Sequence, residues 1–234
     1  MAFSNHLFLL ALLLLLPMAS SAANLIYRQC DKNFTDNNAL STNIKTVLSD
    51  LQTRAPQTGF ANSTATGASL DQVYGLAQCQ GNAQQIDCSD CLATAITKIS
   101  ECTNQTMAYI WYNLCFVRIS NENFFGSIKD GVGTIFNDFS DALNPIAFSA
   151  AVHNLTSQLL KNVLDSGAKM FGIATADVTG TEGISSISGV AQCTADLKLS
   201  TCYECLNWAV LQSKACETKK SCSILHSSCT ISFR

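Results

Sequence analysis

The sequence predicts an α+β protein built as a tandem repeat of two disulfide-stapled modules. Three observations carry this prediction: a hydrophobic leader, twelve cysteines in 234 residues, and a cysteine pattern that occurs twice. A leader sends the chain into an oxidising compartment, where an even set of cysteines forms disulfides. Helical stripes and strand-like runs alternate within each copy of the pattern, as expected when helices pack on one face of an antiparallel sheet.

The leader contains ten consecutive apolar residues from Leu7 to Leu16, followed by small residues up to Ala23. This is typical of a secretory signal peptide over residues 1–23, and the run is too short to span a bilayer. No second such stretch follows, so we expect a secreted protein without a transmembrane anchor. Four glycosylation sequons agree with export, at Asn33, Asn62, Asn104 and Asn154.

The charge and composition exclude several other classes of protein. The net charge is −3 and only 13% of the residues are charged, so a nucleic-acid partner is not expected. Twelve Gly and three Pro are too few for a collagen-like or disordered chain. The remaining hydrophobic content is enough for a packed core.

The cysteine pattern C-x8-C-x2-C-x10-C-x12-C begins at Cys79 and again at Cys193, a constant offset of 114 positions (193 − 79). Neighbouring residues keep the same register, because Gly75–Gln78 matches Gly189–Gln192. We therefore predict a first module over residues 24–127 and a second over 146–234, each of ordinary domain size. The connector, 128–145, carries the apolar residues Val132, Ile135, Phe136 and Phe139, so we expect it to pack between the modules.

Each module begins with an amphipathic helix. Apolar residues recur at helical spacing in both copies, and Pro56 is expected to lie just beyond the first of these helices. The stripes are Leu40, Ile44, Val47, Leu48 and Leu51 in the first module, and Leu155, Leu159, Leu160, Val163 and Leu164 in the second.

Strands and a second helix follow. Val73–Cys79 and Ile187–Cys193 are expected to be core strands, and Tyr109–Ile119 one long strand. The C-x2-C opens the second helix, for which Thr201 and Glu204 form a possible capping box, with Asp87 and Asp90 at the same positions in the first module.

The repeated C-x8-C-x2-C, the segment from Ile110 to Arg118 and the late Ser228-Cys229-Thr230-Ile231 resemble a plant family. This is the cysteine-rich, ginkbilobin-homologous (salt-stress/antifungal) domain. Two such domains behind a leader are similar to cysteine-rich repeat secretory proteins, and to the ectodomains of cysteine-rich receptor-like kinases and plasmodesmata-located proteins. The resemblance implies two helices on a five-stranded antiparallel sheet in each module.

The resemblance also implies a disulfide pairing, which spacing alone leaves open among 15 arrangements of six cysteines. It implies Cys79–Cys88, Cys91–Cys115 and Cys30–Cys102, and the repeat then implies Cys193–Cys202 and Cys205–Cys229. Cys216 and Cys222 remain and are expected to pair with each other.

Two alternatives for the cysteines and one for catalysis are less favoured. Twin C-x2-C pairs could bind zinc or act in redox chemistry, but the export signal and the regular partner cysteines favour disulfides, and we expect no metal and no cofactor. Only His153 and His226 remain as bases behind the leader, and no nucleophile motif accompanies them. We therefore expect no enzyme activity. Tyr109, Trp111 and Tyr112 could stack on a sugar, although alternating aromatic residues in a strand are more often core.

The founding antifungal seed domain of the family binds mannose through a triad of Asn, Arg and Glu. The matching positions here are Asp31, Tyr109 and Ser120, and in the second module two positions hold Ser223 and Arg234. Sugar hydroxyls need charged or amide groups in bidentate geometry, so we predict weak or no mannose binding by this route.

Two functions remain after these exclusions. The first is a secreted, non-enzymatic binding protein of the plant apoplast, which recognises an extracellular protein or a cell-wall carbohydrate in stress, defence or cell-to-cell signalling. The second is a lectin-like antifungal protein that binds mannose-type glycans. The rigidity of a disulfide-stapled surface favours binding in both cases.

Overall fold

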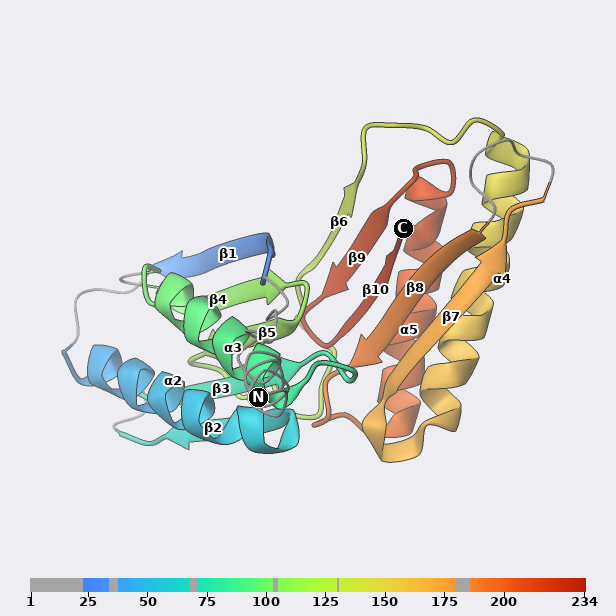
Figure 1. The fold of residues 1–234 in the computed structure, drawn as a ribbon. Coiled ribbons are helices and arrows are strands. Elements are labelled where there is room, and N and C mark those ends of the chain that lie inside the picture. Colours follow the sequence, from blue (N-terminus) through green and yellow to red (C-terminus); the bar gives the residue numbers. More distant parts are fainter. Residues whose placement is uncertain (1–22, 34–37, 68–70, 103–104, 130, 180–185) are drawn as a thin grey trace, which may run out of the picture.

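The computed structural model describes residues 23–234 except 34–37, 68–70, 103–104, 130 and 180–185. The predicted leader therefore lies almost wholly outside the described residues. The chain forms two α+β modules that lie side by side, each with two long helices covering one face of a five-stranded antiparallel sheet (Figure 1). The predicted fold class is confirmed.

The sheet of module one, which we call the first sheet, has the strand order β1-β4-β5-β3-β2. Helices α2 and α3 pack on one face of it, where their apolar stripes form a core with the inner side chains of the strands. The elements are β1 (Leu25–Asn33), α2 (Asn38–Thr58), β2 (Phe60–Ala65), β3 (Val73–Cys79), α3 (Gln85–Ile99), β4 (Gln105–Tyr112) and β5 (Cys115–Ser120).

The second sheet, in module two, has the equivalent order β6-β9-β10-β8-β7. Helices α4 and α5 cover its inner face and make a separate core. The elements are β6 (Gly133–Asn137), α4 (Pro145–Asp165), η1 (Gly167–Lys169), β7 (Phe171–Asp177), β8 (Ser186–Cys193), α5 (Leu199–Gln212), η2 (Ser213–Cys216), β9 (Cys222–His226) and β10 (Cys229–Phe233).

Six disulfides tie these elements together, and they include every cysteine of the chain. In each module one disulfide joins the end of a strand to the start of a helix, and another joins that helix to the neighbouring strand. The pairs are Cys30–Cys102, Cys79–Cys88, Cys91–Cys115, Cys193–Cys202, Cys205–Cys229 and Cys216–Cys222. These are the pairs that the resemblance, the repeat and the two remaining cysteines imply.

The segment Tyr109–Ile119 is a hairpin and not the single long strand that its composition predicts. Strands β4 and β5 pair in antiparallel register, with Trp111 opposite Phe116. The reversal takes place at Asn113 and Leu114, which lie between the two strands. Asn113 was the one turn-favouring residue in the segment, and its signal was hidden by the aromatic residues around it.

The helix ends also differ from the prediction. Pro56 lies inside α2, and the helix ends where Gly59 adopts a positive φ of 82° and its N–H donates to the Ala55 carbonyl at 2.8 Å. Helices α3 and α5 begin at Gln85 and Leu199, so Asp87 and Thr201 lie within the first turn. Neither cap residue, Gln84 or Lys198, makes a side-chain capping bond.

The connector contributes a strand to module two. Residues 133–137 form β6 at the edge of the second sheet, paired with β9, so the second sheet starts inside the segment 128–145. Val132 and Phe136 pack against a cluster shared by both modules, and Ile135 packs into the module-two core. The expectation for Phe139 is wrong, because this side chain is 97% exposed.

Candidate ligand groove between the modules

Two glutamines from equivalent repeat positions hold the modules together. Gln78 Nε2 donates to the Cys193 carbonyl at 3.0 Å, and Gln78 Oε1 accepts from the Ala195 N–H at 2.9 Å. The second glutamine, Gln192, repeats the arrangement in the opposite direction. Its Nε2 donates to the Cys79 carbonyl at 3.0 Å and its Oε1 accepts from the Gly81 N–H at 3.1 Å. We call these four bonds the glutamine clasp.

Beside the glutamine clasp, the outer face of the first sheet is an aromatic surface that module two covers. Trp111 is 2% exposed and stacks with Tyr109 at a centroid distance of 5.6 Å. The cluster extends to Leu225 of β9, and Tyr27 of β1 contacts Phe136 of β6 at 5.0 Å. Such burial of large aromatic side chains fixes the relative position of the two modules.

A buried cation lies in the same interface. Arg118 is 2% exposed, and its guanidinium carbon lies 3.8 Å from the ring centre of Phe124 and 5.2 Å from that of Tyr109. Arg118 Nη1 donates to Ser227 Oγ of module two at 3.4 Å. The aromatic faces stabilise the charge where water is excluded.

Next to the clasp, the modules leave a groove of about 680 Å³, within the usual range for ligand sites. Its floor is the outer face of the second sheet. One wall comes from module one, where the β4–β5 turn and the segment after β3 contribute Asn113, Gln80 and Asn82. Amide residues of module one, these three among them, thus line the groove opposite the sheet surface.

One row of side chains crosses all five strands of the second sheet at this floor. The pairing register places Phe136, Ser223, Ser232, Val190 and Ile173 next to each other in that order. Ser232 Oγ and Ser223 Oγ are 3.0 Å apart and hydrogen-bonded. The floor therefore offers a hydroxyl pair beside two aliphatic side chains.

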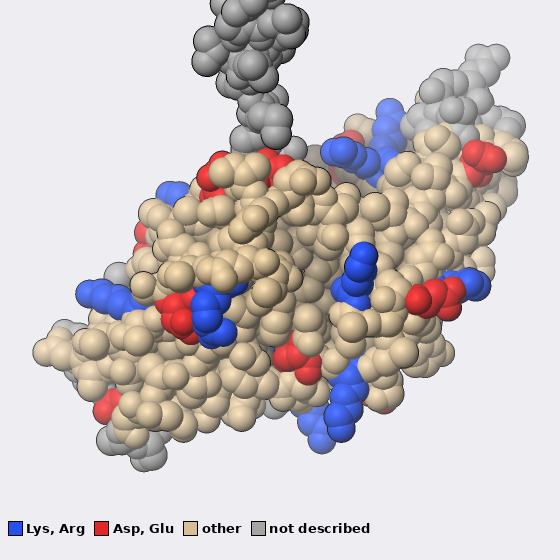
Figure 2. Space-filling model, turned by 60° about the horizontal axis from the view of Figure 1, so that its bottom comes forward, with Lys and Arg blue, Asp and Glu red and all other residues tan. Residues whose placement is uncertain are grey.

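The groove is almost free of charge. Among the described residues that line it, Arg234 is the one Lys, Arg, Asp or Glu. Burial lowers the pKa of His226 to about 4, with a smaller contribution from Arg118, so this imidazole is neutral near pH 7. Figure 2 shows that acidic and basic side chains are also scattered over a mostly uncharged surface on the face it presents, without a basic patch.

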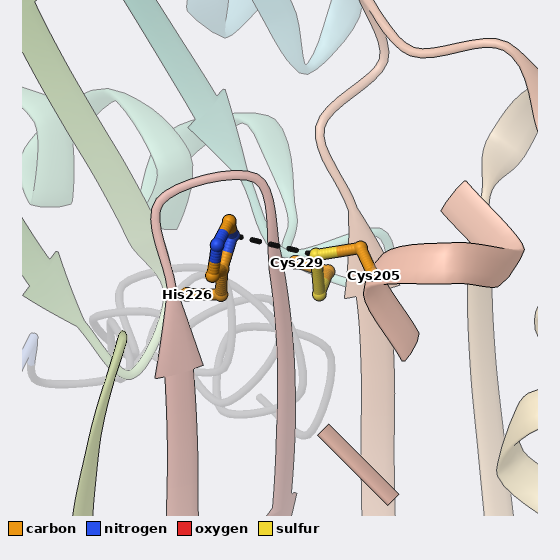
Figure 3. A group of neighbouring side chains, drawn as sticks. All are labelled: Cys205, His226 and Cys229. Carbon is orange, nitrogen blue, oxygen red and sulfur yellow. Dashed lines mark hydrogen bonds between the residues drawn. A yellow bond between two sulfur atoms is a disulfide. The ribbon is translucent and has the colours of Figure 1, made fainter. Parts of the chain in front are cut away.

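His226 also belongs to a cluster that resembles a metal site by composition. The Cys205 and Cys229 sulfurs and the imidazole lie within 4.8 Å of one another (Figure 3). The two sulfurs form a disulfide, and His226 Nδ1 faces Cys205 Sγ at 3.4 Å while accepting from the Ser228 N–H at 3.2 Å. A disulfide offers no thiolate, so this donor set does not suit zinc. The two C-x2-C pairs weighed as zinc ligands were Cys88 with Cys91 and Cys202 with Cys205, and the two cysteines of each pair belong to different disulfides.

The family's mannose positions lie on the outer face of the first sheet. Asp31 and Ser120 flank Met107 in one cross-strand row, and Tyr109 follows two residues along β4. Asp31 is exposed, but Tyr109 is 0% and Ser120 1% exposed. The Tyr109 hydroxyl donates to Met107 Sδ at 2.8 Å, and this bond is buried in the aromatic cluster between the modules. The three positions therefore lie close together in the structure, but Tyr109 and Ser120 are buried.

The module-two counterparts have a different environment. Ser223 and Arg234 both line the open groove. The sequence identified these two positions through the repeat but could not show that they are accessible. The sequence also aligned Gln78 with Gln192 but did not reveal that they join the modules. The available signal was that a glutamine precedes the cysteine at the same position in both repeats.

Two of the four predicted glycosylation sites can be placed. Asn62 on β2 and Asn154 on α4 are exposed, and Asn154 Oδ1 accepts from Gln158 Nε2 at 2.9 Å. Of Asn33 the structure describes the backbone in β1, and Asn104 lies outside the described residues. Asn62 and Asn154 both face away from the two cores, where a glycan can be accommodated.

The fold and the groove define a class of protein: two homologous, disulfide-stapled α+β domains fixed against each other, with a ligand-sized depression between them. A family model described as "Salt stress response/antifungal" matches residues 28–122 and 138–234. The chain belongs to this family, and each of its modules is one copy of the family's domain.

The chain is similar to secreted plant proteins over most of its length. It is 32% identical to cysteine-rich repeat secretory protein 55 of Arabidopsis thaliana, over 95% of this chain and 86% of that protein. It is 30% identical to an antimicrobial ginkbilobin-2-like protein of Castanea crenata, over 92% of this chain and 89% of that protein.

Solved structures show the same two-domain arrangement. The tandem DUF26 ectodomain of the Arabidopsis thaliana receptor-like protein PDLP8 has a TM-score of 0.77 at 23% identity, covering 91% of this chain and 98% of that structure. That of PDLP5 has a TM-score of 0.71 at 26% identity, covering 90% and 98%. In the part of the chain that the structure describes, none of the helices has the length and apolar content of a bilayer span. Secreted relatives and ectodomains indicate an extracellular protein.

Proposed function

We propose that this chain is a secreted, non-enzymatic binding protein of the plant apoplast, which recognises a protein partner or a cell-wall polymer in stress, defence or cell-to-cell signalling. The observation that carries the proposal is the groove between the modules, whose described lining offers amide and hydroxyl groups for hydrogen bonds and a single charged side chain, Arg234. Rigid walls favour binding, because disulfides and the glutamine clasp reduce the ordering cost of association.

A catalytic role has little support in the groove. Hydrolysis needs a base near a nucleophile, and the one histidine that lines the groove, His226, uses Nδ1 to accept the Ser228 N–H. Its lowered pKa makes it a weak base. The relatives described above carry the names of a secretory repeat protein, an antimicrobial protein and two receptor-like proteins, which agrees with a binding role.

An affinity pull-down of the mature, glycosylated protein from cell-wall and plasma-membrane extracts tests the proposal. We expect a wall polymer or an extracellular protein to be retained, and to be lost when Ser232 in the groove is replaced by Glu. Retention that Ser232→Glu leaves unchanged, or turnover of a wall substrate by the purified protein, would contradict it.

A lectin-like antifungal function is the second candidate, favoured by the antimicrobial name of the Castanea crenata relative. The burial of Tyr109 and Ser120 argues against mannose at the family's positions. Calorimetric titration of the protein with mannose is expected to show no binding with a dissociation constant in the millimolar range or below. Binding of that strength that is lost in the Asp31→Ala variant would restore this candidate.

A further inference from the structure

We propose that the free edge of the second sheet is a self-association site, at which β7 of one molecule pairs with β7 of a second copy in antiparallel register. Strand β7 forms the edge opposite β6 (Figure 1), so this pairing joins the two second sheets into one continuous antiparallel sheet. The inference goes beyond the proposed function, because it concerns a contact between two copies of the chain and not the ligand of the groove.

The backbone of β7 has hydrogen-bonding groups that point away from its own sheet. Thr175 lies opposite Ser188 of β8, but the N–H and the C=O of Ser188 bond to Arg234 on the other side, at 2.9 and 3.0 Å. Opposite residues of an antiparallel pair exchange either two backbone bonds or none, so the N–H and C=O of Thr175 face the edge. The backbone groups of Ile173 and Asp177, two residues to either side, face the same way.

The other three sheet edges carry features that oppose the addition of a strand. Strand β1 has a bulge near its start and charged side chains at Arg28 and Asp31. Strand β6 is 5 residues long and lies beside module one, where Phe136 contacts Tyr27 at 5.0 Å. Strand β2 carries Asn62, a predicted glycosylation site. Among the described edge strands, β7 is the one with no bulge, no Lys or Arg and no sequon.

Strands β2 and β7 occupy equivalent edges of the two modules, and the difference between them shows which edge is open. In β2 the Asn62 carbonyl accepts a bond from Arg54 of α2. In β7 the Ile173 carbonyl accepts one from Asn162 of α4 at 2.8 Å. Asn62 and Ile173 are each the third residue of their strand. The same place is thus a sequon asparagine in module one and a 48% exposed isoleucine in module two.

The edge of β7 is complementary to itself about a two-fold axis at Thr175. Around this axis Thr175 pairs with its own copy, and Ile173 lies opposite Asp177 of the second copy, so like charges do not face each other directly. The outward N–H and C=O groups then bond in both directions, and Asn162 keeps its bond to the Ile173 carbonyl. The same patch on both molecules forms the contact, as a closed dimer requires.

Analytical ultracentrifugation of the mature, glycosylated protein tests the inference. We expect the average mass to rise from the monomer value towards twice that value as the protein concentration increases from the low micromolar to the millimolar range. A constant monomer mass over this range would overturn the proposal, even if the edge binds an extended peptide of another protein.

Ile173→Asn is the sharpest variant, because it places a sequon at residues 173–175, as in the equivalent strand β2. A glycan at this position covers the edge, so the variant should remain monomeric at all concentrations. Mass spectrometry verifies that the glycan is attached. Ile173→Gln is the matched control, because it introduces a polar side chain at the same position without a sequon, and it should still dimerise.

Thr175→Pro tests the backbone bonds themselves. Proline removes an N–H that faces the edge and takes no part in pairing with β8, so the fold should be retained, which thermal unfolding verifies. The dissociation constant of the dimer should rise by about tenfold or more. If Thr175→Pro fails to fold, Ile173→Asn still decides the question. A dimer that neither variant weakens uses another surface, and the inference is then wrong.

Discussion

The outer faces of the two sheets carry different side chains and are buried to different extents. Module one carries Tyr109 and Trp111 on this face, and the same repeat positions in module two carry Ser223 and Leu225. The aromatic face is buried in the interface, whereas much of the hydroxyl face forms the floor of the groove. One outer face is therefore a docking surface and much of the other is accessible, while the helices, the sheets and two disulfides per module are equivalent.

The third disulfide also differs between the modules. Cys30–Cys102 joins the edge strand β1 to the segment after α3 across 72 residues, whereas Cys216–Cys222 spans 6 residues. Strand β1 stands at the start of the described chain and is tied by a covalent bond. Strand β6 has no cysteine, and the loop after it is held by the Lys219–Asp141 ion pair at 2.7 Å and by neighbouring backbone bonds.

The largest expected effect tests whether the aromatic face is needed. Trp111→Ala should lower the free energy of unfolding by about 3–5 kcal/mol, since it removes a large buried side chain from the interface. Urea denaturation of the purified protein measures this. Leu225→Ala, in the same cluster but on the module-two side, should cost about 2–5 kcal/mol. If both variants lose less than about 1 kcal/mol of unfolding free energy, as a surface substitution would, the aromatic cluster does not stabilise the interface as described.

The two third disulfides should contribute unequally. By the chain-entropy model, replacing Cys30 and Cys102 together by Ser should cost about 4 kcal/mol, and replacing Cys216 and Cys222 about 2 kcal/mol, because the longer loop restricts the unfolded chain more. Denaturation of both double variants under the same conditions gives the comparison. Equal losses, or a larger loss for the short loop, would show that native contacts around each bond outweigh loop length.

The symmetry of the glutamine clasp is testable by single and double changes. Gln78→Ala and Gln192→Ala should each lower the free energy of unfolding by about 1–3 kcal/mol, because each leaves a backbone carbonyl and an N–H without their partners. The double variant should also allow limited proteolysis to separate two halves, whereas we expect the native protein to resist such cleavage. Gln158→Ala, at a half-buried position on α4 away from the clasp, is the control. A cleavage rate equal to that of the native protein would count against the clasp.

The smallest effect concerns pH. The pKa of His226 is lowered from 6.5 to about 4, so the unfolded state takes up its proton first as the pH falls. Stability due to this group is thus complete above about pH 6.5 and decreases towards pH 4, by about 2 kcal/mol between pH 7 and 5. His226→Gln should remove this part of the pH dependence measured by thermal unfolding, and His153→Gln on α4 is the control. An unchanged slope in His226→Gln would refute the assignment.

The sequence predicted what depends on local pattern and on the repeat. The constant offset located both modules, and the apolar stripes located α2 and α4. It missed the β4–β5 hairpin, where Asn113 was the weak signal, and β6, because Gly133–Asn137 becomes a strand only by pairing with β9 some 90 residues later. The predicted starts of α3 and α5 were also displaced, because sequence patterns locate the ends of helices only to within a few residues.

The groove could not be predicted, because it depends on how two modules lie against each other. Its wall residue Asn82 and its floor residue Ser232 are distant in sequence. They line the same groove because the glutamine clasp holds the two modules together. The repeat did show that Gln78 and Gln192 are equivalent. The glutamine repeated next to a buried cysteine was a signal of hydrogen bonds between the modules. The hydrophobic periodicity of the sequence does not show which groups such a side chain bonds.

The glutamine clasp has a consequence for the ancestry of this architecture. Because both halves of the clasp come from the same repeat position, a one-domain chain with this glutamine would present a self-complementary surface to a copy of itself. In the tandem protein one polypeptide carries both halves of this contact, which makes the contact intramolecular and gives it a high effective concentration.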